Sequence, residues 1–138
     1  MFRFLLVALA LLFTPAVAMT AEPDSADQVV ERLFKDIQRG DTNAAYANVG
    51  RGTLMEQKKT ELQLLASQTS NALQLYGKVI DWELVGEEKW GSNYLRRNYL
   101  VRAERGPLFF NMHLYRTPKE WTVGQIFFTD TPSKLPEL

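Results

Sequence analysis

The first regular pattern in the chain is a stripe of apolar residues between positions 24 and 39. These residues recur at three- and four-residue steps, so they would share one face of an α-helix. Asp24 or Ser25 can cap its start by accepting a free backbone N–H, and Gly40 can end it in a left-handed conformation. We predict an amphipathic helix over residues 24–39 with a buried face made of Ala26, Val29, Val30, Leu33, Phe34 and Ile37.

Two more helical stretches follow Gly40. Asp41 and Thr42 offer a new cap, and the segment NAAYANV continues as a short second helix. Residues 53–76 form a longer stretch, in which the polar segment SQTSN leaves two alternatives: one long helix, or two helices with a break near Ser70. Gly77 predicts the end of this stretch. The expected buried side comprises Leu54, Leu62, Leu65, Ala66, Leu73 and Tyr76.

After Gly77 the hydrophobic pattern changes to a period of two, which is typical of strands. Ile80, Trp82 and Leu84 alternate with acidic residues and predict a half-buried strand. Three further segments alternate in the same way, and short turns separate them, so neighbouring strands would pair. The sequence therefore predicts an antiparallel meander of four strands, within residues 78–90, 94–104, 107–116 and 120–130.

Helices followed by antiparallel strands are the pattern of an α+β domain, in which helices cover one face of a sheet. The chain shows no internal repeat and no linker, so we expect a single domain over residues 22–131. Residues 132–138 contain two prolines and are predicted to form a flexible C-terminal tail.

The order of these elements resembles the nuclear transport factor 2-like superfamily. The segment RGDTNAAYANV, in which Gly40 and Asp41 precede Ala45 and Tyr46, matches its break between the first two helices, and Trp121 with Val123 matches its closing strand. The resemblance covers roughly residues 24–130 and implies a cone, with helices packed into a strongly bent four-stranded meander. A cystatin-like arrangement, with a long helix on a similar meander, is the alternative fold.

The N-terminus has the features of a secretory signal peptide. Arg3 is followed by an unbroken apolar run from Phe4 to Phe13, then by Pro15 and the small residues Ala16-Val17-Ala18. The run is shorter than the about 20 residues of a membrane-spanning helix. We predict a signal peptide over residues 1–18 and a periplasmic or secreted product. The alternatives are a retained membrane anchor, or translation from Met19.

Composition excludes several kinds of site. The chain has 16 basic and 16 acidic residues without a basic stripe, which disfavours nucleic-acid binding. It has no cysteine and one histidine, so thiol nucleophiles, disulfides, thiolate metal sites and multi-histidine metal clusters are excluded. We expect no cofactor and no metal.

The candidate site is the interior of the cone. The superfamily includes enzymes that use carboxylates, tyrosines or histidines in this hollow, but none of their catalytic sets aligns with this chain, so no catalytic residue is assigned. Asp130 follows the last strand and is interpreted as a turn residue. The polar side chains expected to line a pocket are Tyr46, Tyr76, Arg97, Tyr99 and Gln125.

His113 lies in the third predicted strand, where alternate side chains share a face. Leu108, Phe110, Met112 and Leu114 form the apolar set that suits the helices, which places His113 on the opposite face. Without a partner it is interpreted as a half-exposed rung of the sheet. Members of the superfamily commonly pair through this outer face, so the resemblance implies a homodimer, with a candidate interface made of Leu100, Phe109, Asn111, His113 and Tyr115.

These observations leave three functional hypotheses. The preferred one is an exported, non-enzymatic module that binds a partner protein or an apolar small molecule in the cone. The second is a small isomerase-, dehydratase- or hydrolase-like enzyme that uses inward-facing polar residues. The third is a homodimeric structural or interaction module. A cavity with an acid within hydrogen-bond reach of a tyrosine or histidine would favour the enzyme, whereas an apolar cavity would favour ligand binding.

Overall fold

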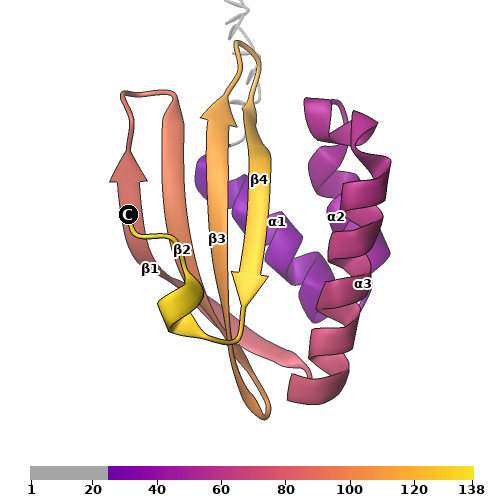
Figure 1. Cartoon of the computed structure of the whole chain (residues 1–138). Helices are drawn as coiled ribbons and strands as arrows, with labels where there is room; N and C mark the ends of the chain where they lie inside the picture. Colours follow the sequence, from indigo (N-terminus) through magenta and orange to yellow (C-terminus); the bar gives the residue numbers. More distant parts are fainter. Residues whose placement is uncertain (1–24) are drawn as a thin grey trace, which may run out of the picture.

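The computed structural model describes residues 25–138, and the predicted signal peptide lies outside this range. A four-stranded antiparallel meander of order β1-β2-β3-β4 packs against helices, with α1 behind the sheet and α2 and α3 beside the β4 edge (Figure 1). The predicted α+β arrangement is therefore confirmed. The elements are α1 Ala26–Gln38, α2 Thr42–Gly50, η1 Leu54–Gln57, α3 Lys59–Tyr76, β1 Val79–Lys89, β2 Tyr94–Ala103, β3 Gly106–Arg116, β4 Trp121–Thr129 and η2 Pro132–Lys134.

Helix α1 forms as its apolar stripe predicts. Ser25 caps it in a capping box, since its Oγ accepts from the Gln28 amide at 3.2 Å while the Gln28 side chain accepts from the Ser25 amide at 2.9 Å. Gly40 follows the helix with a φ of 85°, a conformation that glycine adopts without steric cost. All six predicted stripe residues are buried. Local capping and burial of one face thus place α1 against the sheet.

The third helical stretch breaks at a different place from the one considered. The break lies at Lys58, between η1 and α3, and the helix continues through Ser70. Thr69, in the polar segment, is fully buried and hydrogen-bonds Tyr46 of α2, so tertiary packing keeps this part helical. The expected burial of Leu54 is wrong: it is 79% exposed, because it belongs to η1 and not to the apolar side of α3.

Two bulges alter the first strand. The ladder to β2 shifts register between Val79 and Asp81 and again between Leu84 and Gly86. Each bulge adds a residue that lacks a partner and changes which side chains face the core. Ile80, predicted as half-buried, is consequently 50% exposed. Leu84 keeps its place opposite buried Tyr99 but is 45% exposed, because β1 is an edge strand.

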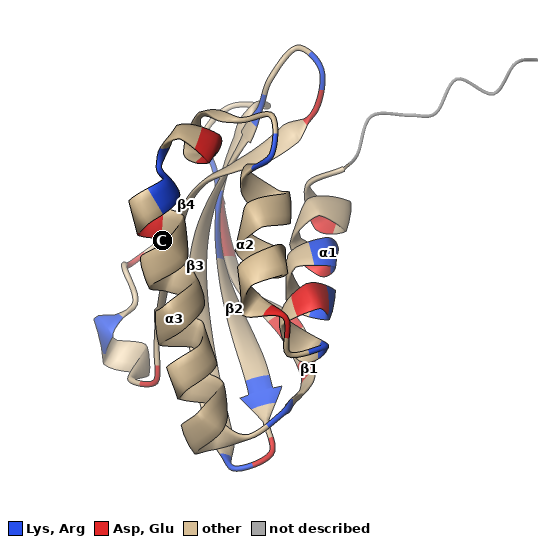
Figure 2. Cartoon of the chain, turned by 90° about the vertical axis from the view of Figure 1, so that its right-hand side faces the viewer, with Lys and Arg blue, Asp and Glu red and all other residues tan. Residues whose placement is uncertain are grey.

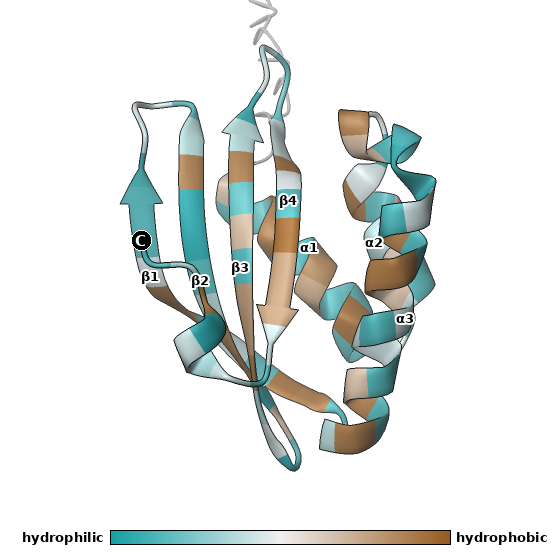
Figure 3. Ribbon diagram, in the orientation of Figure 1, coloured by the Kyte–Doolittle hydropathy of each residue, from teal (hydrophilic) through white to brown (hydrophobic). Residues whose placement is uncertain are grey.

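The inner face of the sheet supplies the core. Along β3, hydrophobic positions alternate with hydrophilic ones (Figure 3), and the four residues predicted to face the helices are at most 2% exposed. Phe34 of α1 lies at the centre, with its ring 5.3 Å from those of Tyr99 and Phe110 and 5.4 Å from that of Trp82. Side chains therefore fill the middle of the fold.

Tyr46 is buried in this core, and its hydroxyl shares a 2.7 Å hydrogen bond with Thr69. Burial raises its pKa from 10.0 to about 12, while the hydrogen bond to Thr69 opposes that rise. Below pH 10 the phenol is neutral in both the folded and the unfolded chain. Its full contribution to the free energy of unfolding is therefore present there.

Between pH 10 and pH 12 we expect stability to fall because of Tyr46. The unfolded phenol ionises first, so unfolding becomes more favourable by about 2–3 kcal/mol across this window, at about 1.36 kcal/mol per pKa unit. Urea titrations of the wild-type protein and of Tyr46→Phe at pH 8, 10 and 12 measure the effect. The wild-type protein should lose more stability than the variant, and equal losses would contradict the assignment.

The segment after β4 crosses the outer face of the sheet, opposite α1 (Figure 1). After η2 it reaches β1 and β2, where Arg96 donates from Nη2 to the Glu137 carbonyl at 2.7 Å. Leu138 Cδ1 lies where a side chain on Gly86 would be, 2.8 Å from an ideal Cβ. The residues predicted as a C-terminal tail are placed by these contacts.

None of the helices within residues 25–138 combines the length and apolar character needed to cross a membrane.

Candidate functional site

The five side chains expected to line a pocket occupy four different environments. Tyr46 and Tyr99 are 1% and 5% exposed and belong to the core. Arg97 is buried in an ionic cluster, and Tyr76 lines an open groove. Gln125 is exposed and pairs with His113 across the ladder, which places it on the outer face. The register shift between His113 and Leu114 produces this placement and corrects the expectation for Gln125.

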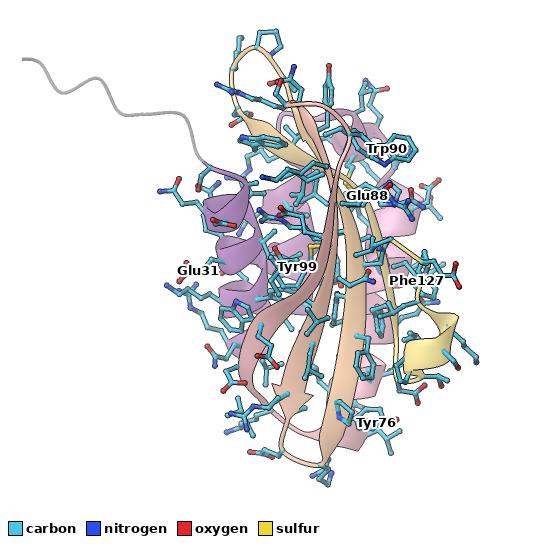
Figure 4. The ribbon with its side chains drawn as sticks, turned by 90° about the vertical axis from the view of Figure 1, so that its left-hand side faces the viewer. Glu31, Tyr76, Glu88, Trp90, Tyr99 and Phe127 are labelled. Atoms are coloured by element: carbon cyan, nitrogen blue, oxygen red, sulfur yellow. The ribbon has the colours of Figure 1, made fainter. Side chains whose placement is uncertain are left out.

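Arg97 connects α1 to the sheet. Its Nη1 donates to Asp27 Oδ1 of α1 at 2.7 Å, and its Nε donates to Glu87 Oε2 of β1 at 2.7 Å. The same Nη1 lies 3.1 Å from the Tyr99 hydroxyl, which stands between the sheet and α1 (Figure 4). Because the side chain is buried and its Nε and Nη1 are engaged by the protein, Arg97 serves the fold and not an open site.

An open groove lies between α3 and the edge strand β4. It has a volume of about 540 Å³, within the usual range of about 300–1,000 Å³ for small-molecule pockets. Inner-face residues of the sheet form one wall together with Phe127 of the edge strand, and α3 forms the other. Its apolar lining comprises Leu65, Ala72, Leu75, Leu108, Ile126, Phe127 and Phe128.

The groove exists because α3 packs mainly against α2 and η1 and not against the sheet. The view onto the helices shows α3 beside the sheet, and residues 62–76 carry no charged side chain (Figure 2). Ala72 is small and leaves room at the middle of the helical wall. The groove is consequently a largely apolar space with an uncharged helical wall, and it opens beside the core.

Tyr76 closes one end of the groove. Its ring packs on Gly106, where an ideal Cβ would be 2.8 Å from Cδ1 of the tyrosine, so glycine is needed at this turn. Its hydroxyl donates to Asp130 Oδ2 at 2.6 Å. Arg105, next to Gly106, caps α3 by donating from Nε to the Leu75 carbonyl at 2.8 Å and from Nη2 to the Gln74 carbonyl at 2.9 Å.

Tyr76 and Asp130 shift each other's pKa in opposite directions. The hydrogen bond from Tyr76 lowers the pKa of Asp130, as does a second one from the Thr131 hydroxyl. The hydrogen bond to Asp130 raises the pKa of Tyr76. At neutral pH the carboxylate is therefore ionised and the phenol is protonated. A general acid or base works best when its pKa is near the operating pH. Here the pKa values of both groups are shifted away from neutral pH.

Asp130 was interpreted as a turn residue, and its contact with Tyr76 was not expected. Tyr76 is the last residue of α3 and Asp130 directly follows β4. The two are 54 positions apart, and only the path of the chain brings these ends together.

On the outer face, the alternation predicted for β3 is confirmed, and His113 lies on this side, half-buried. Its Nδ1 shares a 2.6 Å hydrogen bond with the Tyr94 hydroxyl. Burial lowers its pKa, and the positive charge of Arg96 lowers it further, so the ring is neutral at neutral pH. Glu88, a nearby carboxylate, accepts from Arg96 at 2.7 Å, and within residues 25–138 no carboxylate hydrogen-bonds the His113 ring.

The candidate interface residues share the outer face but differ in exposure. Asn111 is only 2% exposed and donates to Asn98 Oδ1 at 2.7 Å, whereas Tyr115 is 49% exposed. Phe127 lies on this side near η2, and Trp90 stands at the far end of the sheet (Figure 4). The interface role of Leu100, Phe109, Asn111, His113 and Tyr115 stays a prediction.

A larger recess, of about 750 Å³, lies between η1 and the β3–β4 turn. Exposed residues of η1 and of the turn line much of it, including Glu56, Lys58 and Lys119. The groove beside α3 differs because two of its polar groups, Tyr76 and Asp130, form a hydrogen-bonded pair at one end. No group of three or more His, Cys, Asp or Glu residues within 25–138 is arranged to hold a metal ion.

Comparison with solved structures identifies the architecture. A crystal structure from Campylobacter jejuni, at 2.00 Å resolution and named an NTF2-like transpeptidase, superposes with a TM-score of 0.52. The match covers 72% of this chain and 97% of that one, at 17% sequence identity. This chain has an NTF2-like fold. At this identity the NTF2-like match establishes the fold alone.

No protein-family model matches the chain, and a search of curated proteins finds no match either. The NTF2-like architecture nevertheless agrees with the resemblance drawn from Gly40, Asp41 and Trp121. In this NTF2-like domain the centre of the cone is filled, and the open space lies at its β4 edge.

Proposed function

We propose that the protein is an exported binding module that holds an elongated apolar small molecule in the groove between α3 and β4. The observation that carries the proposal is the combination of an apolar lining with a hydrogen-bonded Tyr76–Asp130 pair at one end. Small-molecule sites are typically apolar, with a few placed polar groups that fix the orientation of the ligand.

The chemistry of the ligand follows from this end of the groove. Asp130 is exposed and ionised, so it can accept a further hydrogen bond from a donor on the ligand. The apolar walls suit a hydrocarbon or aromatic body. The preferred ligand is therefore an apolar molecule with an amine, amide or hydroxyl group at one end.

The enzyme alternative receives less support. Tyr76 and Asp130 meet the distance criterion for an acid–tyrosine pair, but their pKa values are displaced away from neutrality. The name of the Campylobacter structure would imply acyl transfer, which uses an activated nucleophile such as serine or cysteine. The chain has no cysteine, and the groove lining contains no serine.

Ligand binding can be tested by fluorescence titration with 1-aminoanthracene, an apolar aromatic ring with one amine donor. Ala72→Trp fills the groove and should raise the dissociation constant at least about tenfold, since bulk replaces ligand contacts. Tyr76→Phe keeps the ring and removes the hydroxyl, and we expect a several-fold weakening.

The matched control is Leu64→Trp. Leu64 lies on the same helix, is 57% exposed and does not line the groove. This control should bind as the wild-type protein does. Equal dissociation constants for Ala72→Trp and the wild-type protein, with both variants folded by circular dichroism, would overturn the proposal.

Export is the second part of the proposed function, and the pattern of residues 1–18 supports it. N-terminal sequencing of the protein from the periplasmic or extracellular fraction should find a terminus near Met19. An intact Met1 in the membrane fraction would contradict export by cleavage.

A further inference from the structure

The sheet has two edge strands, β1 and β4, because its four strands follow one another in chain order. Along an edge strand, every second residue turns its backbone N–H and C=O groups away from the sheet. Such a row of groups can pair with another extended chain, and proteins commonly prevent this with charged side chains, prolines, bulges or a covering segment. The two edges of this sheet differ in how far they are protected.

Strand β1 is protected along most of its length. Five of its eleven residues are charged: Asp81, Glu83, Glu87, Glu88 and Lys89. Two bulges interrupt its ladder, and Gln38 of α1 covers its start by donating from Nε2 to the Ile80 carbonyl at 2.9 Å. Another chain would meet charge, irregular backbone and an occupied carbonyl at this edge. β1 is therefore a poor template for a further strand.

Strand β4 carries less protection. It contains no charged residue and no proline, and the contrast with the hydrophilic end of β1 is visible in Figure 3. Its bulge lies at Gly124, so residues 125–129 run opposite β3 in regular register. Among residues 25–138, no backbone hydrogen bond joins β4 to a helix. The second half of β4 is thus an uncharged and regular edge.

The groove beside α3 lies against this edge of β4. Five consecutive residues, 126–130, line it. Successive side chains of a strand point to opposite faces of the sheet, so a space that is lined by consecutive residues lies beside the strand edge. Ile126 and Phe128 reach the groove from the inner face, and Phe127 reaches it from the other. The outward backbone groups of this half of β4 therefore border the groove.

The opposite wall, α3, limits what can occupy the groove. The space between helix and strand has a volume of about 540 Å³ and is bounded on both sides. At about 3.3 Å per residue, the edge from position 126 to 130 matches an extended segment of about four or five residues. A second copy of this chain does not fit, since its own α3 borders its β4 and would collide with the first α3. One isolated extended segment fits.

We propose that the groove binds a short, extended apolar peptide that adds to β4 as a fifth strand. The inference rests on the proposed function, because it uses the same groove, and it assigns the ligand to the peptides. In strand addition, main-chain hydrogen bonds supply affinity and pockets for alternate side chains supply specificity. Side chains on one face of the peptide would contact Leu108 and Ala72, and a peptide N–H at one end would donate to Asp130.

Isothermal titration calorimetry of the full chain tests the proposal with the peptide acetyl-Val-Thr-Val-Thr-Val-amide. This probe is uncharged and rich in residues that favour strands. A version methylated at every peptide nitrogen keeps the side chains and loses the N–H donors, so it should bind at least about tenfold more weakly. Equal affinity of the two peptides, or no binding of the first at about 1 mM, would overturn strand addition.

Hydrogen exchange followed by nuclear magnetic resonance locates the bound peptide. A fifth strand should slow the exchange of alternate backbone amides within residues 125–129 at least about tenfold, because these amides gain ladder hydrogen bonds. Amides of β1 are the internal control and should not change. Saturation with 1-aminoanthracene gives the baseline, since this molecule has no backbone that could extend the sheet. Protection at β1, or at neither edge, would contradict the proposal.

The variants described above complete the test. Ala72→Trp fills the groove and should weaken the peptide at least about tenfold, whereas Leu64→Trp should leave its affinity unchanged. If 1-aminoanthracene binds in the groove and the peptide does not, strand addition is wrong and the small-molecule site stands. If the peptide protects β4 while Ala72→Trp leaves 1-aminoanthracene binding unchanged, strand addition is supported and the small-molecule function is wrong.

Discussion

Phe34→Ala is expected to lower the free energy of unfolding by about 3–5 kcal/mol, the usual range for removing a buried aromatic ring. Phe34 is fully buried and contacts three other aromatic rings from β1, β2 and β3. The cavity left by its ring would lie between α1 and the sheet, where the neighbours are held on separate strands and cannot all move inward.

Urea unfolding followed by circular dichroism measures the effect of Phe34→Ala. The midpoint should fall while the denaturant slope stays the same. Leu64→Ala, at a position 57% exposed, is the control and should change stability by no more than about 0.5 kcal/mol. A loss below about 1 kcal/mol for Phe34→Ala would place this ring outside the cooperative core.

Arg97→Met should destabilise the protein by about 2–3 kcal/mol, somewhat less than the about 3–5 kcal/mol typical of a fully buried pair. Methionine keeps the length of the side chain, but Glu87, whose side chain is 24% exposed, loses its 2.7 Å contact with Arg97 and keeps only the longer contact, of 3.8 Å, with Lys89. Asp27 is 79% exposed and can be solvated by water, which limits the total loss.

A double-mutant cycle separates charge from packing at this position. Glu87→Gln in the Arg97→Met background should recover part of the lost stability, because it removes a half-buried carboxylate that has lost its closest partner. Urea midpoints of the wild-type protein, both single variants and the double variant give the coupling energy. Strict additivity of the two changes would show that the Arg97–Glu87 contact does not stabilise the folded state.

The sequence predicted best where one periodic pattern controls burial. The α1 stripe and the alternation along β3 each bury residues on a single face, so any other register would expose several apolar side chains. The continuation of α3 through Ser70 could not be predicted because Thr69 owes its helical environment to Tyr46, which is distant in the sequence. The exposure of Ile80 results from a bulge, which alternation of hydrophobic and polar residues does not reveal.

The candidate sites could be predicted only in part, because each combines distant segments. Tyr76 was expected to line a pocket, but Asp130 becomes its partner through the path of four strands. Gln125 was expected inside and lies outside, since the bulge at Gly124 reverses the alternation along β4.

The way α3 is attached has a consequence for selectivity. The helix is held along α2, and Arg105 and Tyr76 fix its C-terminal end, while the wall that faces β4 has little sheet packing to lose. A small outward bend of α3 would widen the groove without opening the aromatic cluster around Phe34. Selection among ligands would therefore depend on their length and on the hydrogen-bond donor that contacts Asp130. Ligands of different widths would be accepted.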